Sequence, residues 1–356
     1  MMDPCFINGI ASISAQPTTN PTSFLEEIIS YHQPIFKAKD PDYKQYISPA
    51  TMRRMSKAVK MGVTAATMAL EASATSIPDA IITGTGMGCK QDSERFLENI
   101  LHNDEEFLTP TPFIQSTHNT VGGQIALGLG CKAYNITYVQ GSVSFELAAM
   151  DAQLILSEEP SKHILVGGID EVAKNSIVLH TYDEQIKDTD AVDVMNLLNT
   201  KTIGSVSSEG ATFMVLGSKK TEKSLAKIID IHTISKATPD IIQEQIETFI
   251  IRQGMTLQDI DTVILGNNGD INFDHYYTSL QTSIFSDMEQ LCYKHLIGEY
   301  PVASGFGFWL ASKIFTLNKV PSVLKVNQIK AKKHINILLY NQYLGKDHSI
   351  VLLQKC

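Results

Sequence analysis

Short apolar runs that end near glycine alternate with longer segments of helical periodicity through most of the chain. The strand-like runs include residues 79–88, 163–171, 210–218 and 262–270, and the helix-like segments include 53–74, 144–159, 238–254 and 305–317. Such alternation is typical of layered α/β proteins. The rhythm returns in the second half, where TVILGNNGD weakly echoes the earlier HILVGGIDE. We therefore predict an α/β fold, and the echo suggests an internal duplication.

The composition argues against several classes of function. The chain has 356 residues, of which 43% are hydrophobic and 19% charged, so it can bury a large core. A net charge of -9 argues against binding to nucleic acid or to anionic membranes. No apolar run approaches the ~18 residues that span a bilayer, and the N-terminus lacks the basic residues of a secretory signal. Five scattered cysteines show no zinc spacing, so we predict a reduced, cytoplasmic protein without a metal.

Seven segments in collinear order resemble motifs of the β-ketoacyl-acyl-carrier-protein synthase family. They are RRMSKAVKMG, IITGTGMGCKQDSERFLENI, PTPFIQSTHNTVGGQIALGLGCKAYNIT, HILVGGIDE, SSEGATFMVLGSKKT, KHLIGEYPVASG and NQYLGKDHSIVLL. Each motif alone is weak, but the ordered set runs from about residue 50 to the C-terminus. The resemblance implies the thiolase fold, in which two similar halves form five α-β-α-β-α layers, normally in a dimer. We place the halves at residues 1–222 and 223–356.

The family's nucleophile is absent from its expected place. A ketoacyl synthase needs a cysteine at the N-terminus of a buried helix, where the helix dipole favours the thiolate and backbone N–H groups stabilise the oxyanion. Gly141 takes the cysteine position here, or Gln140 if the alignment shifts by one residue. Neither residue can carry an acyl thioester. A glutamine at this place resembles the chain-length-factor subunits and decarboxylating loading domains of the family.

The two catalytic histidines of the family are also replaced. The first position is Asn268 and the second is Glu299. Asn268 can still donate a hydrogen bond. An ionised Glu299, however, would repel a malonyl carboxylate by ~4 kcal/mol at a separation of about 4 Å if the effective dielectric is near 20. Lys294 matches the family's lysine in this motif, so Lys294 and Glu299 could simply form a salt bridge.

The closing loop of the family is altered as well. Tyr343 corresponds to the phenylalanine that gates the acyl pocket, and Leu344 replaces a glycine, which restricts the backbone. The resemblance thus assigns Gln140, Lys294 and Tyr343 to substrate binding. It confirms no catalytic residue, because the positions of the nucleophile and of both histidines have all changed.

Other polar residues near these motifs have simpler roles open to them. Ser142 is a candidate substitute nucleophile, with His118 or Glu299 as its base, but helix capping is the favoured role for Ser142 and Ser144. His118 lies in a stretch that is near the dimer interface in the family, so a structural role is preferred. Asp170 is expected to accept structural hydrogen bonds at the end of its strand.

Three functions are compatible with these observations. The first is a non-catalytic, chain-length-factor-like partner of a ketoacyl synthase with an intact Cys-His-His set, in a fatty-acid or polyketide-type pathway such as aryl-polyene synthesis. The second is a divergent acyltransferase that uses Ser142, and the third is a scaffold that binds acyl chains or carrier protein. No bound cofactor is expected, because acyl groups would arrive on the phosphopantetheine of an acyl carrier protein. The sequence leaves open the substrate, the chain length, and whether the chain forms a heterodimer or a homodimer.

Overall fold

The computed structural model describes residues 3–189 and 192–356. Ten strands form one sheet in the order β10-β9-β11-β12-β8-β1-β7-β5-β3-β4. Their bounds are β1 Cys5–Ile13, β3 Ala80–Gly84, β4 Tyr134–Tyr138, β5 His163–Asp170, β7 Gly210–Gly217, β8 Ala226–Ser235, β9 Thr262–Leu265, β10 Glu289–Cys292, β11 Asn336–Tyr343 and β12 Asp347–Gln354. The short strands β2 (Ile35–Phe36) and β6 (Ser207–Ser208) pair separately.

The sheet consists of two blocks with the same topology. In the N-terminal block, β3 runs parallel to β4 and β5, and β7 pairs antiparallel with β5 and β1. In the C-terminal block, β9 runs parallel to β10 and β11, and β12 pairs antiparallel with β11 and β8. A short antiparallel pairing between β1 and β8 joins the blocks. The predicted boundary at residues 222 and 223 lies in the link between β7 and β8.

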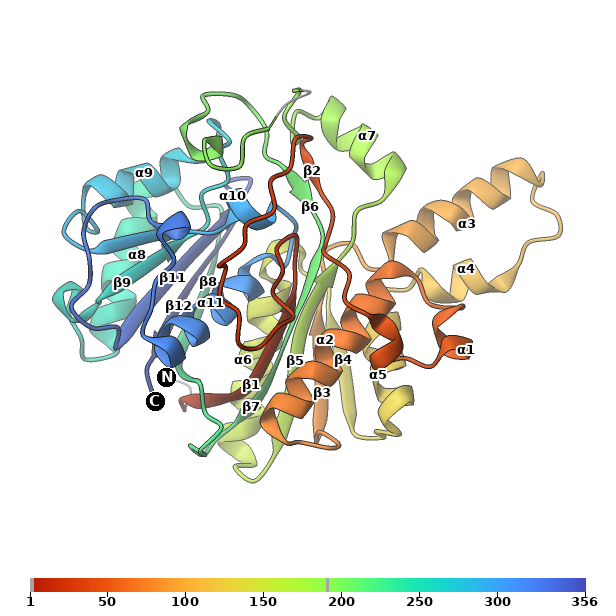
Figure 1. Cartoon of the computed structure of the whole chain (residues 1–356), viewed down its shortest axis with the longest axis horizontal. Coiled ribbons are helices and arrows are strands. Elements are labelled where there is room, and N and C mark those ends of the chain that lie inside the picture. The colour runs from red at the N-terminus through yellow and green to blue at the C-terminus, as the bar shows by residue number, and fades with distance from the viewer. Residues whose placement is uncertain (1–2, 190–191) are drawn as a thin grey trace.

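Helices cover both blocks and separate them, which completes five layers (Figure 1). The outer layer of the N-terminal block contains α2 (Lys57–Ser73) and α5 (Thr120–Leu129), and that of the C-terminal block contains α8 (Pro239–Arg252) and α9 (His275–Thr282). The central layer is formed by α6 (Ser144–Glu158) and α11 (Ser304–Leu317). The predicted thiolase-type layering is therefore confirmed. Among the described residues, no helix is long and apolar enough to cross a membrane.

Five further helices lie outside these layers. Two of them, α3 (Lys90–His102) and α4 (Pro110–Gln115), form an arm that projects from the N-terminal half (Figure 1). The others are α1 (Pro49–Met52), α7 (Lys174–Tyr182) and α10 (Lys294–Ile297).

The central helix α6 is buried because its sequence carries almost no polar face. Phe145, Ala148 and Ala152 are fully buried, as predicted for residues 144–159. Its ring partner across the layer is Phe308 of α11, with ring centroids 5.1 Å apart. Strand β5 has a glycine, Gly168, where it contacts the Phe145 ring. A Cβ atom at this position would lie only 2.7 Å from the ring. This close packing fixes the N-terminus of α6 at the centre of the molecule.

The first strand was missing from the sequence-based prediction. β1 lies between β7 and β8 at the middle of the sheet. Its sequence, CFINGIASI, lacks a clear apolar–polar alternation because both of its faces are covered. Gly9 serves close packing there, as a Cβ atom would come within 2.4 Å of the Ala69 carbonyl oxygen of α2.

Candidate functional site

The predicted position of the nucleophile, in the turn before α6, carries no side chain. Gly141 has a φ of 56°, in the left-handed region that glycine adopts most readily. A Cβ atom built at Gly141 would have one neighbour within 4 Å, the Oδ2 atom of Asp347, at 3.6 Å. A cysteine placed here would therefore face a carboxylate, which disfavours a thiolate. Gln140 is exposed, and its backbone N–H donates to Ser144 Oγ at 2.8 Å.

The two serines of this turn do not cap α6, so that prediction was wrong. A 3-10 turn at Gly141–Val143 precedes the helix and places Val143 at the cap position. Ser144 Oγ instead lies within donating distance of the Gly141 and Thr85 carbonyl oxygens, at 2.8 and 3.0 Å. Ser142 Oγ donates to Asp347 Oδ2 at 3.2 Å. Both hydroxyls stabilise the turn.

The structure does not bring Ser142 together with either of its predicted bases. Its hydroxyl bonds to Asp347, and neither His118 nor Glu299 is its hydrogen-bond partner. His118 is exposed and lies against Gly88 of the loop after β3. The sequence analysis missed Asp347, although it stands in the closing loop that the family motif identifies. A serine and a carboxylate alone lack the imidazole that would carry the proton.

The two former histidine positions meet in a buried ion-pair cluster. Asn268 Nδ2 donates to Glu299 Oε2 at 2.8 Å, and Lys294 Nζ donates to Glu299 Oε1 and Oε2 at 2.8 and 2.7 Å. All three residues are buried. Burial raises the pKa of Glu299, and the attraction of the Lys294 ammonium opposes that rise. The predicted salt bridge is thus present, and these polar groups satisfy one another rather than a substrate.

Backbone contacts hold this cluster in place. The carboxylate of Asp274 accepts the backbone N–H groups of Asn268 and Gly269, at 3.2 and 2.9 Å. Burial raises the Asp274 pKa to about 6. From the other side, the buried Lys187 donates to the carbonyl oxygens of Gly269 and Thr202. The loop after β9 is therefore fixed by charges on both sides.

A second buried carboxyl lies on α6 and was not predicted. Glu146 is fully buried, and Ser349 Oγ donates to its Oε1 atom at 2.7 Å. Burial raises the pKa of Glu146, which favours the neutral acid. The sequence did contain a signal, since Glu146 is an ionisable residue near the start of an otherwise apolar helix.

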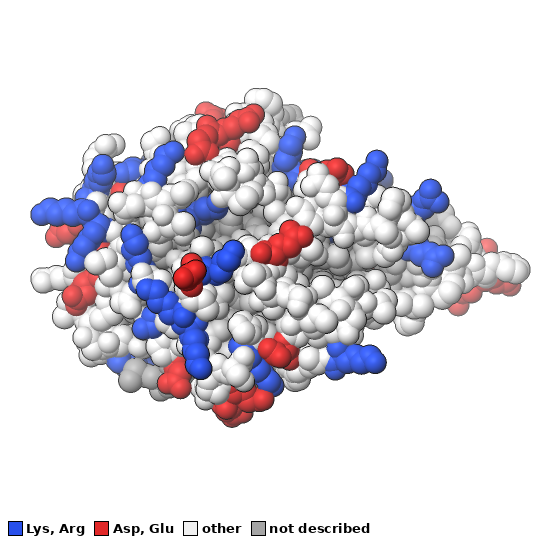
Figure 2. All heavy atoms as spheres, turned by 60° about the horizontal axis from the view of Figure 1, so that its bottom comes forward, with Lys and Arg blue, Asp and Glu red and all other residues white. Residues whose placement is uncertain are grey.

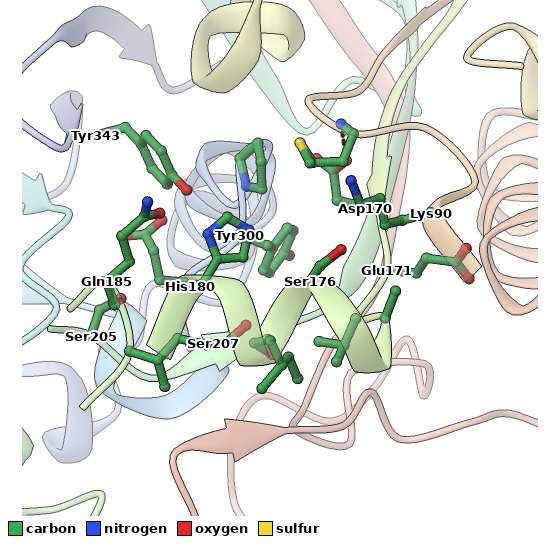
Figure 3. Close-up of a pocket in the computed structure, with 18 residues that line it drawn as sticks. Lys90, Asp170, Glu171, Ser176, His180, Gln185, Ser205, Ser207, Tyr300 and Tyr343 are labelled. Carbon is green, nitrogen blue, oxygen red and sulfur yellow. Dashed lines mark hydrogen bonds between the residues drawn. The ribbon is translucent and has the colours of Figure 1, made fainter. Parts of the chain in front are cut away.

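A small cavity adjoins the cluster (Figure 3). Its volume is about 90 Å³, and Glu299, Tyr300 and Tyr343 form part of its lining. Figure 3 shows the hydroxyl of Tyr343 directed into the cavity and Ser176 and His180 presented by α7. Cavities for organic ligands usually measure roughly 300–1,000 Å³. The space at Glu299 is therefore too small for an acyl thioester in this conformation, and Gly141 is not part of its lining.

Tyr343, the predicted gate residue, is followed by a strained loop. The following residue, Leu344, has a φ of 51° despite its side chain, and Gly345 has a φ of 61°. Burial raises the pKa of the Tyr343 hydroxyl, which therefore stays a neutral donor at neutral pH. The sequence identified the replacement of glycine by Leu344 but gave no indication of its conformation.

The acid at the end of β5 accepts backbone hydrogen bonds, as the sequence analysis expected. Asp170 accepts the N–H groups of Gly86, Met87 and Val302. Burial raises the pKa of Asp170 to about 6. The next acid, Glu171, accepts the N–H groups of two further segments and has a pKa raised to about 7 by burial. Among the described residues, no group of three or more His, Cys, Asp or Glu side chains could hold a metal ion.

Comparison with known proteins places these features in context. The sequence model described as "Beta-ketoacyl synthase, N-terminal domain" matches residues 31–223. A search of curated proteins gave no match. Among solved structures, a chain of the ishigamide ketosynthase/chain length factor superposes with a TM-score of 0.80 at 16% identity, with 100% of both chains covered. A β-ketoacyl synthase from Burkholderia phymatum STM815 gives 0.81 at 13% identity, again with 100% of both chains covered.

A third structure contains the ketosynthase ApeO in complex with its chain length factor ApeC, from Xenorhabdus doucetiae. It superposes with a TM-score of 0.76 at 12% identity, covering 99% of this chain and 98% of the other. At such low identities, these superpositions establish a shared fold over the full length.

Proposed function

Because this chain belongs to the β-ketoacyl synthase family, we propose that it is a non-catalytic, chain-length-factor-like subunit that pairs with an active ketosynthase. The observation that carries the proposal is the buried contact of Asn268 and Lys294 with Glu299. In an active synthase, these positions would face the substrate. Here they neutralise one another, and the turn before α6 carries Gly141 at the predicted position of the nucleophile. The scaffold is retained while its chemistry is absent.

An exposed apolar surface at the β4 end of the sheet supports a protein partner. β4 pairs only with β3, so its other edge is unpaired among the described residues. Large apolar side chains lie exposed on and beside it, namely Leu127 (75% exposed), Tyr134 (48%), Val139 (46%) and Leu154 (50%). An open edge with apolar neighbours is a template for association. On the face shown in Figure 2, the surface next to the α3–α4 arm also carries few Lys, Arg, Asp or Glu side chains.

The solved structures with the same fold include ketosynthase and chain-length-factor assemblies. By analogy with them, the partner would be a ketosynthase with intact Cys-His-His, and acyl groups would reach the pair on an acyl carrier protein. The proposal includes no metal or bound cofactor of this chain's own, and it keeps the cytoplasmic location that the sequence suggests.

Co-expression with a ketosynthase that retains the Cys-His-His set tests the proposal. We expect a stable heterodimer on size-exclusion chromatography with light scattering, and a change in product chain length when the subunit is omitted. A stable homodimer that neither binds the ketosynthase nor alters its products would refute it. The acyltransferase alternative predicts a covalent acyl adduct on Ser142 after incubation with acyl-carrier thioesters, which mass spectrometry would detect.

A further inference from the structure

A second cavity lies far from the former catalytic positions, between β1, α2 and α11. Its volume is about 420 Å³, which is within the usual range of roughly 300–1,000 Å³ for ligand sites. Most of the side chains that define its walls are apolar, including Ile10, Met68, Trp309 and Leu317. None of these residues belongs to the Asn268–Lys294–Glu299 cluster. The cavity is therefore a separate feature of the molecule.

One wall of the cavity carries a positive charge without a carboxylate partner. Lys313 of α11 lies over the Trp309 ring, with Nζ 5.5 Å from the ring centroid. Its Nζ atom donates to the backbone carbonyl oxygens of Pro21 and Ser23. Among the described residues, no carboxylate oxygen lies within 4.0 Å of this ammonium. Burial lowers the pKa of Lys313, and the more distant Glu26 carboxylate opposes this shift only in part.

An unpaired, half-buried ammonium beside an apolar cavity suits a ligand with an anionic head and an apolar tail. The head would gain an ion pair with Lys313, and the tail would remove apolar walls from water. Glu71 of α2 also lines the cavity, but it is exposed, so solvent screens its charge. We propose that this cavity binds a medium-chain fatty acid, with its carboxylate at Lys313 and its chain against Trp309 and Met68.

The chain provides a built-in reporter for this site. Trp309 is the only tryptophan of the protein and forms part of the cavity wall. A bromine atom quenches tryptophan fluorescence only at short range, so an undecanoic acid brominated on the part of its chain that lies against Trp309 would report occupancy directly. We expect saturable quenching that unbrominated decanoate reverses by competition. Quenching that rises linearly with concentration, without saturation, would overturn the proposal.

Two pairs of variants test the position of the ligand. Ala72 is exposed and lines the cavity, so Ala72→Phe fills space without disturbing the core. It should abolish saturable quenching, whereas Ala72→Ser at the same position should not. Lys313→Gln should weaken binding of the brominated acid by about fivefold, the upper end for one partly screened ion pair, and Lys313→Arg should retain it.

A further control tests whether the carboxylate of the ligand pairs with Lys313. Bromoundecanol has the same chain without the carboxylate, so it should bind more weakly than the acid to the unmodified protein and should not respond to Lys313→Gln. Glu71→Gln should strengthen binding of the acid, since it removes a like charge. Equal binding of acid and alcohol, or saturable quenching that persists in Ala72→Phe, would show that Lys313 and this cavity do not form the site. Thermal melting of each variant verifies that it is folded.

Discussion

The strands β4 and β10 occupy equivalent positions in the two blocks, yet the outer edge of β4 is exposed and that of β10 is covered. Both are the last strand of the sheet, and each pairs in parallel with one neighbour. No residue of β4 is buried, whereas all four residues of β10 are. The same topology thus ends in an open edge in one half and a closed edge in the other.

The β10 edge is closed by the segment that follows α11. Val326 N–H donates to the Gln290 carbonyl oxygen at 3.0 Å, and Gln290 N–H donates to Asn327 Oδ1 at 3.2 Å. The Asn327 side chain also donates to the Met288 carbonyl oxygen at 2.8 Å. These bonds satisfy the backbone groups that an edge strand otherwise exposes. Topology alone therefore does not determine where the chain associates. The covering segment leaves the β4 edge as the open end of the sheet, where we propose that the partner binds.

The two halves also differ at the former reaction centre. The N-terminal half contributes a turn around Gly141 with a single serine–carboxylate hydrogen bond. The C-terminal half contributes a buried ion pair. Substitutions in the C-terminal half should consequently affect stability more than substitutions in the turn.

The largest effect is expected for Lys294→Met. This change leaves the Glu299 carboxylate buried without its cation, and breaking a buried pair costs about 3–5 kcal/mol. Urea unfolding should show a loss of that size, and Lys294→Met combined with Glu299→Leu should recover most of it. The control is Lys319→Met, in an exposed pair with Glu26 whose side chains are 57% and 52% exposed. An exposed pair contributes about 0–1 kcal/mol. Equal losses in the two single variants would contradict this contrast between a buried and an exposed pair.

The next effect concerns the open edge. Leu127→Asp places a charge on α5 beside β4 and should weaken binding of the ketosynthase roughly 100-fold, because a central interface residue is typically worth about 2 kcal/mol or more. Ile251 of α8 is the matched control, being 68% exposed on the C-terminal half. Ile251→Asp should leave binding unchanged. Titration calorimetry or co-purification measures both, and a greater loss from Ile251→Asp would place the interface on the other half.

Most of the fold could be predicted from the sequence, because the spacing of apolar residues indicates which segments are buried strands and which are buried helices. Residues 144–159 were predicted as a buried helix, and α6 spans Ser144–Glu158. β1 and β10 escaped prediction. Each is covered on both faces, so neither shows the alternation that identifies a strand.

The candidate site was only partly predictable, because sequence motifs give positions but not contacts. The alignment identified Asn268, Lys294 and Glu299, and the structure joins them through hydrogen bonds. It gave no indication that Asp347 would face Ser142, since that contact spans 205 residues of sequence. The closed edge of β10 could not be predicted either, because the segment that covers it, around Val326 and Asn327, has no regular secondary structure.

Two buried carboxyl groups of the N-terminal block should make a pH-dependent contribution to stability. Asp170 and Glu171, at the end of β5, have pKa values of about 6 and 7 when folded, against ordinary values of 3.8 and 4.5. The folded state keeps protons that the unfolded chain has already lost. The contribution of these two groups to the free energy of unfolding should therefore fall as pH rises from about 4 to about 7.

Glu171→Gln tests this assignment, since it removes one titrating group from the strand end. The difference in unfolding free energy between the unmodified protein and this variant should decline with pH over that window, by on the order of 2 kcal/mol. The equivalent end of β11 carries Gln342 and Tyr343, which supply no carboxylate. A difference that is flat with pH would place the dependence elsewhere, for example in Asp274 of the C-terminal half.

The smallest effect is expected for Ser142→Ala in the turn before α6. The variant loses one hydrogen bond to Asp347, and a bond of this kind contributes about 0.5–1.5 kcal/mol. Chemical denaturation should show a loss in that range, below that of Lys294→Met, while the ketosynthase partner should retain its affinity and its product length. Because the hydroxyl has no imidazole partner, its removal should change no rate. Loss of an acyl adduct or of turnover in Ser142→Ala would show that Ser142 takes part in catalysis. The contrast between an inert turn in the N-terminal half and a structural ion pair in the C-terminal half would then be wrong.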